Sequence, residues 1–470
     1  MDEFLALAVG STLGGIAALL AVLGIWLALR LSGRLSTHGL LPWFFPTQVA
    51  AAAISMAATG RSFDASGTVT SVAVTASWAG EWSIRIASIV ALWGAVDAII
   101  RWLRSTERVF SWRLVLILAF SFLWVTQVAS PAWWGRHPSF QTYWVYALPV
   151  GVGLLCLDAR AARQTLLWFR DAQVLFCFLS LVLAVVWPDL ALQRDYEQGF
   201  IDGLPRLAGL APHPISLAGV AATTLVVLLY FPYARPWLQR LAMLSSVLVV
   251  LLAQSKTVWL ILALALPMVL AYQGRFPTWR SLSQQTPRTW LVGAYGLVLV
   301  GSLSGLALVV SGEVGHKLNS FLASSDGAQL MSLTGRDRIW SVALEEWRQD
   351  PLFGYGMPLF DEAHRAAVRM GAATHAHNQF VDSLARAGLV GLVGAVAYLL
   401  VLVAAAWRVA TPSRGLSLGL LVILLAFAIT EVPLSLTGIG LANFYHMVLL
   451  VVLGSALAGR GADEESPRAQ

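Results

Sequence analysis

The sequence predicts an all-α integral membrane protein with about 12–13 transmembrane helices and one long, partly helical loop on the outer side. Hydrophobic residues make up 58% of the 470 residues and charged residues only 12%, and the mean hydropathy is +0.71. A soluble domain carries about twice that charged fraction. Apolar runs of about 20 residues, each long enough to cross a bilayer, recur from one end of the chain to the other.

Thirteen of these runs are predicted to span the membrane, ten within residues 1–311 and three within residues 388–458. Residues 459–470 are rich in charged and small residues and are predicted to form a disordered cytoplasmic tail. The predicted spans are 3–29, 40–58, 82–102, 113–130, 142–159, 171–188, 213–232, 240–254, 257–273, 289–311, 388–407, 414–434 and 437–457.

The positions of the basic residues predict the orientation. Alternate connections, together with the C-terminal tail, hold 18 of the 31 Lys and Arg residues, and segments rich in these residues usually face the cytoplasm. The N-terminus is then outside and the C-terminus is cytoplasmic. These 18 residues are Arg30, Arg34, Arg101, Arg104, Arg108, Arg113, Arg160, Arg163, Arg170, Arg235, Arg240, Arg275, Arg280, Arg288, Arg408, Arg414, Arg460 and Arg468.

The only long segment without a predicted span is residues 312–387, on the outer side. It holds seven basic residues, although outer segments are usually poor in them. Apolar residues at helical spacing predict a helix over 335–347 that ends before Asp350-Pro351, and Gly354-Tyr355-Gly356 predicts a turn. A long loop with its own pattern usually carries function, so this loop is the predicted catalytic region.

His377 is the first candidate catalytic residue, because it ends the outer loop and a helix is predicted to begin near Asn378. The positive end of a helix dipole favours a neutral imidazole, which can accept a proton as a general base. Free backbone N–H groups at a helix start also attract anions such as phosphate. From these residues alone, an interfacial histidine without a function is an equally good interpretation.

Three outer cations are candidate substrate ligands. Arg336 and Arg338 are two residues apart and cannot share one face of a helix, so one could bind a ligand while the other forms an ion pair. A guanidinium suits bidentate binding of phosphate, but solvated loop charges would explain both arginines as well. Lys256 lies in the tight turn between two apolar runs, where a charge is costly; it either has a function or extends to the lipid head groups.

Three further residues complete the predicted site. Arg206 precedes the span at 213–232, and His213 lies between two prolines that fix its backbone. Glu431 falls near the outer end of a span, where a carboxylate needs a partner, and an outer cation is the expected one.

Gly388, Gly391 and Gly394 predict a flat ridge for close helix packing.

Several other classes of site are not supported by the sequence. Cys156 and Cys177 lie inside apolar runs and are predicted to be core residues. His375 and His377 could chelate a metal, but no carboxylate cluster accompanies them in the sequence, so neither a metal nor a cofactor is predicted. The positive net charge of +6 is explained by topology, and no nucleic-acid-binding module is present. Outer aromatic residues such as Trp133, Trp134, Trp187 and Tyr196 fit an interface belt better than a sugar-stacking surface.

These motifs resemble the O-antigen ligase superfamily, which includes ligases and polymerases. His377-Asn378, nine further residues and Gly388-Leu389-Val390-Gly391 match the family's H-[NSQ]-x9-G-x-x-[GTY] pattern. The run Arg336, Trp340 and Pro351–Gly356 resembles the family's outer loop, and the resemblance extends over about residues 200–440 to Arg206…His213 and Thr430-Glu431. Thirteen spans would be one more than the family has, and the first could be an addition.

The resemblance implies a metal-independent membrane glycosyltransferase of the GT-C type in a bacterial inner membrane, with its site facing the periplasm. The donor would be a glycan on undecaprenyl diphosphate, and the acceptor a sugar hydroxyl on a glycan or on lipid A-core. His377 would be the base of an inverting reaction, and Arg336 would contact the diphosphate. Arg338, Lys256, Arg206, His213, Asn378, His375 and Glu431 would complete the substrate site. Lys256 stands where the family usually has Arg, so the bidentate fork is lost there.

Two other functions stay open at this stage. The motifs are shared by ligases and polymerases of O-antigen or exopolysaccharide, and a single long outer loop favours a ligase slightly. A transporter of polysaccharide lipids would also have many spans and isolated charges. Transporters usually show internal repeats with paired broken helices, however, whereas here the unusual charges gather beside one outer loop.

Overall fold

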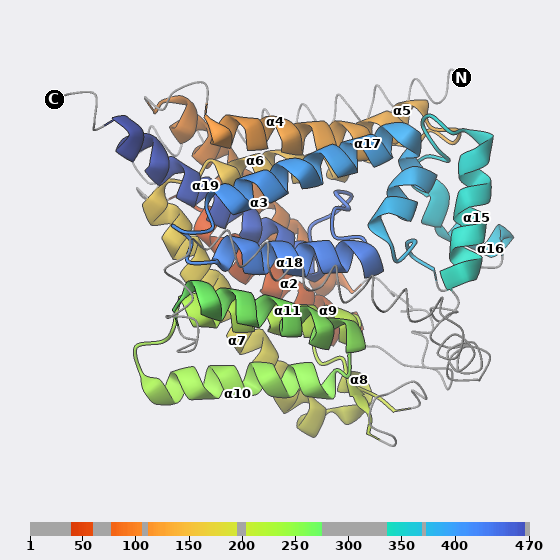
Figure 1. Ribbon diagram of the computed structural model, residues 1–470. Coiled ribbons are helices and arrows are strands. Elements are labelled where there is room, and N and C mark those ends of the chain that lie inside the picture. Colours follow the sequence, from red (N-terminus) through yellow and green to blue (C-terminus); the bar gives the residue numbers. More distant parts are fainter. Residues whose placement is uncertain are drawn as a thin grey trace, which may run out of the picture.

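The computed structural model describes residues 39–59, 77–105, 111–194, 204–274, 336–368 and 373–465 (Figure 1). This part is almost entirely helical, with one short antiparallel pair between β1 (Leu192–Gln193) and β2 (Arg206–Leu207). Six helices are long and apolar enough to cross a membrane, and five shorter apolar helices accompany them. The prediction of an all-α polytopic membrane protein is therefore confirmed. The predicted spans 3–29 and 289–311 lie outside the described residues.

The eleven other predicted spans each coincide with a helix. These helices are α2 (Phe44–Thr59), α3 (Trp78–Leu103), α4 (Trp112–Trp124) continued by η2 (Val125–Ala129) and α5 (Ser130–Trp134), η3 (Thr142–Tyr146) continued by α6 (Ala147–Leu155), α7 (Ala159–Val186), α9 (Pro214–Tyr230), α10 (Pro236–Leu252), α11 (Lys256–Tyr272), α17 (Gln379–Arg408), α18 (Leu416–Thr430) and α19 (Phe444–Glu465). Shorter helices are η1 (Leu41–Trp43), α8 (Pro188–Ala191), α15 (Arg336–Gln349), η6 (Met357–Phe360), α16 (Glu362–Ala367) and η7 (Leu441–Asn443).

The two ends of the bundle differ in composition. At the basic end, Arg113 donates to the carbonyl oxygens of Leu157 and Gly454, and Arg170 donates to that of Phe231. Leu157 and Phe231 lie just beyond the ends of α6 and α9, where carbonyl groups have no partner within the helix, whereas Gly454 lies inside α19. The opposite end carries α15 and α16, seen at the right of Figure 1, and is called the site end below.

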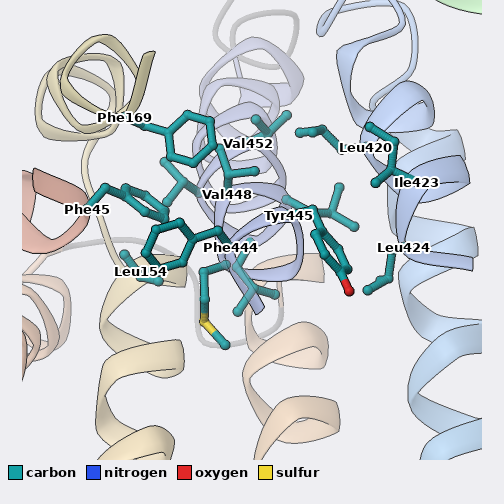
Figure 2. Packing of buried hydrophobic residues seen from close by; sticks show 14 of the residues in the cluster. Phe45, Leu154, Phe169, Leu420, Ile423, Leu424, Phe444, Tyr445, Val448 and Val452 are labelled. Carbon is teal, nitrogen blue, oxygen red and sulfur yellow. The ribbon is translucent and has the colours of Figure 1, made fainter. Parts of the chain in front are cut away.

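Aromatic side chains form the centre of the core where α2, α7, α18 and α19 meet. The ring of Phe45 lies 4.6 Å from that of Phe169 and 5.5 Å from that of Phe444. Tyr445 stacks on Phe427 at 4.8 Å and points toward α18 (Figure 2). Edge-to-face and offset ring pairs of this kind hold helices in register without polar groups. Cys156 and Cys177 are buried, as predicted, and neither forms a disulfide.

The backbone of α17 breaks at Gly388, whose φ of 63° and ψ of −160° are not helical. The segment 379–387 therefore forms a short first helix that turns away from the long segment 389–408, as the site end of α17 in Figure 1 shows. A Cβ on Gly388 would clash with the carbonyl of Leu352, and one on Gly394 with the side chain of Thr126. The predicted ridge thus packs closely at Gly394, while Gly388 makes a kink.

The turn at 350–356 joins two parts of the site end. Tyr355 and Gly356 donate their N–H groups to the carbonyls of Ala385 and Arg386, and the N–H groups of Arg136 and His137 bond back to the turn. Gly354 (φ 75°) and Gly356 (φ 108°) have left-handed backbones, which confirms the predicted turn.

Three sequence boundaries need correction. The last span begins at Leu441, where η7 leads into α19, and not at residue 437, because Pro433 and two glycines, Gly438 and Gly440, interrupt the helical pattern after α18. α7 begins twelve residues before the predicted start at 171, since Asp158 caps it by accepting from the N–H of Ala161. The tail predicted to be disordered from 459 is helical to Glu465, because its Ala and Glu residues favour the helix that precedes them.

Candidate active site

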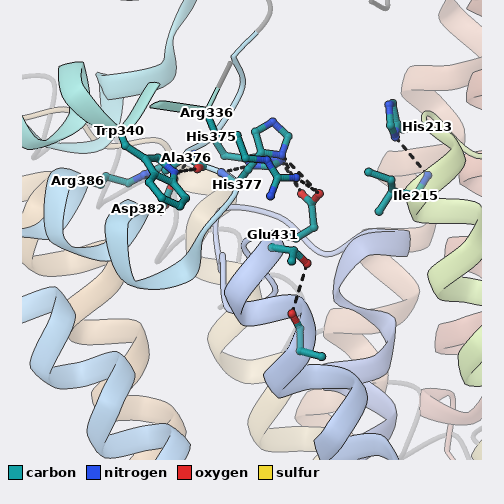
Figure 3. Close-up of polar contacts among 12 residues, drawn as sticks. His213, Ile215, Arg336, Trp340, His375, Ala376, His377, Asp382, Arg386 and Glu431 are labelled. Atoms are coloured by element: carbon teal, nitrogen blue, oxygen red, sulfur yellow. Dashed lines mark hydrogen bonds and ion pairs between the residues drawn. The ribbon is translucent and has the colours of Figure 1, made fainter. Parts of the chain in front are cut away.

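The site is built around the carboxylate of Glu431, the residue that ends α18 (Figure 3). Nδ1 of His377 lies 3.2 Å from one carboxylate oxygen and 3.4 Å from the other. Nε2 of His375 lies 3.5 Å away and Nη2 of Arg336 lies 3.8 Å away. The expectation that Glu431 has a cationic outer partner is confirmed, because Arg336 lies beside it. His375 and His377 lie next to the same carboxylate.

A tight loop brings both histidines to this carboxylate. His377 has a left-handed backbone with φ 50°, and its N–H donates to Nδ1 of His375 at 3.1 Å, so the two rings lie 4.1 Å apart. Two groups outside the histidine pair fix the loop between them. The carboxylate of Asp382 accepts from the N–H of Ala376 at 3.1 Å, and the indole of Trp340 donates to the carbonyl oxygen of Ala376 at 2.8 Å.

Asn378 connects the loop to two helices. Its side-chain oxygen accepts from the N–H groups of Phe380 and Val381, which caps the short helix 379–387 as predicted. Its amide nitrogen donates to the carbonyl of Ile429 in the last turn of α18. The next residue, Gln379, accepts from the N–H of Leu434 just beyond α18. The kink at Gly388 and the hydrogen bonds of Asn378 and Gln379 together place His377 beside Glu431.

The hydrogen bonds fix which nitrogens carry protons. Nδ1 of His375 accepts a backbone N–H, so the proton of its neutral ring is on Nε2, facing Glu431. A carboxylate only accepts, so Nδ1 of His377 carries a proton and donates it to Glu431. Nε2 of His377 then keeps its lone pair, and within the described part of the chain no group bonds to it. A neutral histidine held in this way is equipped to accept a proton.

Burial and charge set the proton affinities around this base. Burial, followed by the neighbouring His377, lowers the pKa of His375 to about 4. Burial alone would raise the pKa of Glu431, but the hydrogen bond from His377 and the charges of His377, His375 and Arg336 more than offset it, so the pKa falls below its usual value. Glu431 is therefore ionised and His375 neutral near pH 7.

The same three residues could be considered as metal ligands, because their donor atoms lie within 4.8 Å of one another. The sequence shows no carboxylate cluster beside His375 and His377, but the fold brings one carboxylate to them, that of Glu431, 54 residues from His377. The donor set nevertheless suits hydrogen bonding better than a metal. A metal at Nε2 of His375 would displace its proton while Nδ1 already accepts a backbone N–H, and Arg336 competes for the carboxylate.

Lys256 lies at the level of Glu431 by the geometry of two packed helices. α11 and α18 run side by side in opposite directions, and Tyr272 at the end of α11 meets Gly415 at the start of α18. From that shared end, α11 extends 17 residues and α18 15 residues, which correspond to about 25 and 22 Å. Lys256, which is exposed, and Glu431 therefore lie at similar positions along the two helix axes, both at the site end.

The other predicted residues do not meet at Glu431. Arg206 is buried and donates to the carbonyl of Ala253, the third residue before Lys256. His213 caps α9 by accepting from the N–H of Ile215, and lies apart from the Glu431 cluster in Figure 3. Arg338 is exposed and donates to the carbonyl of Val368, so Arg336 and Arg338 do point to different partners.

Sequence reasoning missed the residues that hold the catalytic loop. Asp382, Gln379 and the indole nitrogen of Trp340 each bond to backbone near His377 or Glu431. The sequence carried two signals for them: Trp340 belongs to the run that resembles the family's outer loop, and Asp382 stands in the first turn after the predicted helix start, where acidic residues are common.

Comparison with known proteins identifies the family of this region. Residues 241–396 match the family model described as O-antigen ligase. No curated protein matches the chain. The matched segment includes Lys256, Arg336, His375, His377 and the Gly388 kink, whereas Glu431 lies beyond it. The resemblance inferred from the sequence is thus confirmed for residues 241–396, the part of the chain that is similar to the O-antigen ligase family.

Proposed function

We propose that this protein is a membrane glycosyltransferase of the O-antigen ligase type, which moves a glycan from undecaprenyl diphosphate to a sugar hydroxyl. The observation that carries the proposal is the pair His377–Glu431. It leaves one imidazole nitrogen free to act as a base, at the end of a bundle whose middle segment matches the ligase family. The protein would lie in a bacterial inner membrane, with the site end facing the periplasm and the basic end the cytoplasm.

In the proposed reaction, Nε2 of His377 accepts the proton of the acceptor hydroxyl while its oxygen attacks the anomeric carbon of the donor sugar. The new C–O bond forms as the bond from that carbon to the diphosphate oxygen breaks, so the configuration inverts. The carboxylate of Glu431 stabilises the imidazolium that results and holds the ring in its orientation. The diphosphate leaves with the bonding electron pair.

Fixed positive charge near the leaving group is the second requirement. Arg336 is 3.8 Å from Glu431 and only 16% exposed, so it is held in place beside the base. Lys256 stands at the same height on α11. A preorganised cation stabilises charge that develops on a diphosphate, particularly where water is scarce. These two residues are therefore the proposed diphosphate ligands. Arg338 is exposed and would act, if at all, at the edge of the donor site.

The test uses purified protein in lipid nanodiscs, an undecaprenyl-diphosphate-linked oligosaccharide, and either lipid A-core or a second donor molecule as acceptor. We expect product on lipid A-core with wild type and none with His377→Ala. His137→Ala is the matched control, since His137 is an exposed histidine of the site end that does not bond to Glu431. Growth of the donor glycan without lipid A-core would make the protein a polymerase. Donor movement across the bilayer without any transfer would overturn the proposal.

A further inference from the structure

An apolar groove lies between α2 and α7, away from Glu431. Its volume is about 470 Å³, and apolar side chains line it almost completely. The lining includes Ala53 and Ile54 of α2, Ala172 and Leu179 of α7, and Leu210 of the loop before α9. Asp171 is the one ionisable residue of the lining, and its carboxylate is already paired with Arg170 and the hydroxyl of Tyr233. The groove therefore suits a hydrocarbon chain.

The two ends of the groove differ. Trp43 and Trp168 meet at one end with ring centres 4.2 Å apart. Both α2 and α7 run from there toward the site end, and α7 crosses the bundle obliquely in Figure 1. The 11 residues from Trp168 to Leu179 correspond to about 16 Å along the helix. Leu210, whose N–H bonds to the hydroxyl of Ser180, is therefore at the end nearer the site.

The residue at that end, Leu210, connects the groove lining to a polar segment of the chain. Leu210 belongs to the loop 204–213, and this loop bonds twice to the turn that precedes Lys256. Arg206 donates to the carbonyl of Ala253, and the side chain of Gln254 donates to the carbonyl of Leu204. A ligand with a hydrocarbon tail in the groove would thus have its head near the proposed diphosphate ligand Lys256. This arrangement of apolar groove and cationic end matches a polyprenyl diphosphate.

We propose that the α2–α7 groove binds isoprene units of the donor's polyprenyl chain beyond the two nearest the diphosphate. The inference rests on the proposed function, because it assigns a second subsite to the same donor. The surrounding lipid is as apolar as the groove, so binding there depends on packing contacts and not on removal of the chain from water. The groove therefore selects the branched chain of the donor over ordinary acyl chains by shape.

The test fills the groove and varies the donor chain. Ala53→Trp and Ala172→Trp each place a large side chain in the groove, and Val185→Trp is the control, because Val185 is 83% exposed on α7 and does not line the groove. Each variant receives the same oligosaccharide diphosphate on undecaprenyl or on a two-isoprene geranyl chain. Loss of on the order of ten carbon contacts should raise KM for the undecaprenyl donor roughly five- to thirtyfold. Transfer from the geranyl donor should not change.

The outcomes separate this inference from the proposed function. If wild type transfers glycan from neither donor, the proposed function fails. If wild type is active but both groove variants use the undecaprenyl donor normally, or lose both donors equally, the groove assignment fails. A benzophenone amino acid at position 53 gives a readout independent of catalysis. It should crosslink a radiolabelled undecaprenyl donor, and full suppression by excess phosphatidylethanolamine would show that the groove is an ordinary acyl-chain site.

Discussion

Nδ1 of His377 lies 3.2 Å from the carboxylate of Glu431, although the two residues are 54 positions apart in the sequence. The contact fixes the tautomer of His377 and leaves Nε2 as the free basic nitrogen. Glu431 also lies 3.5 Å from Nε2 of His375 and 3.8 Å from Nη2 of Arg336, so one carboxylate organises three positive or potentially positive groups. The predictions below follow from this arrangement.

Glu431→Gln should leave the protein folded but lower kcat by roughly 10²-fold or more, because the amide can still accept from Nδ1 but no longer stabilises the imidazolium. The measurement is single-turnover transfer with saturating donor. Because Glu431 does not reach the diphosphate directly, donor affinity should change little. Equal losses in donor binding and in kcat would contradict an orienting role.

Arg336→Ala should weaken use of the donor by about 2–3 kcal/mol if the guanidinium binds diphosphate where water is scarce. The appropriate quantity is kcat/KM for the undecaprenyl donor. Arg348→Ala, an exposed arginine in the last turn of the same helix, is the matched control and should behave as wild type. A similar loss in both variants would indicate a general charge effect and not a ligand contact.

The site should lose stability as the pH falls from about 6.5 toward 4. The pKa of His375 is lowered to about 4 in the fold, and that of Glu431 also lies below its usual value. The unfolded chain therefore binds these protons at a higher pH than the folded chain does, and each proton that it binds favours unfolding. Thermal unfolding between pH 7 and pH 4 should show this slope, and His375→Gln should reduce it. An unchanged slope in the variant would assign the pH effect to other groups.

Chelation should not affect transfer. His375, His377 and Glu431 have donor atoms close enough for a metal, but their hydrogen bonds and the nearby Arg336 favour a neutral base with a charged partner. Activity should be the same before and after dialysis against EDTA and against dipicolinate. Loss of activity that added zinc restores would show that the three residues hold a metal.

Gly388→Ala should disrupt the site end, because a Cβ there would meet the carbonyl of Leu352 in addition to requiring a left-handed backbone. Gly274→Ala is a matched control, since Gly274 has a similar φ of 66° but no atom within 4 Å of the added Cβ. Limited proteolysis of the outer loop in nanodiscs should become faster in Gly388→Ala than in Gly274→Ala. Equal protection of both variants would mean that the kink is not needed to hold the loop.

The sequence alone determined the class of the protein and most of its elements. A long apolar run in a membrane has to satisfy its backbone polar groups internally, which favours a helix, and the eleven predicted spans within the described residues coincide with six long and five shorter apolar helices. The helix from Arg336, the turn at Gly354–Gly356 and the cap at Asn378 were predictable because each depends on neighbouring residues. Boundaries were less predictable where non-helical backbone lies inside the bundle, as between α18 and Phe444. Hydropathy does not show which side chains form hydrogen bonds with the N–H and C=O groups of such a segment.

The tertiary structure alone decided which candidate residues act together. His377 and Glu431 meet because Gly388 turns the short helix 379–387 toward α18, and no local pattern encodes that direction. The same packing brings Arg206 to the carbonyl of Ala253 and Arg338 to that of Val368, although nothing in the sequence distinguished these cations from Arg336. Local chemistry determines which residues can accept protons or bind phosphate. Contacts between distant helices decide which of them lie close enough to share one carboxylate.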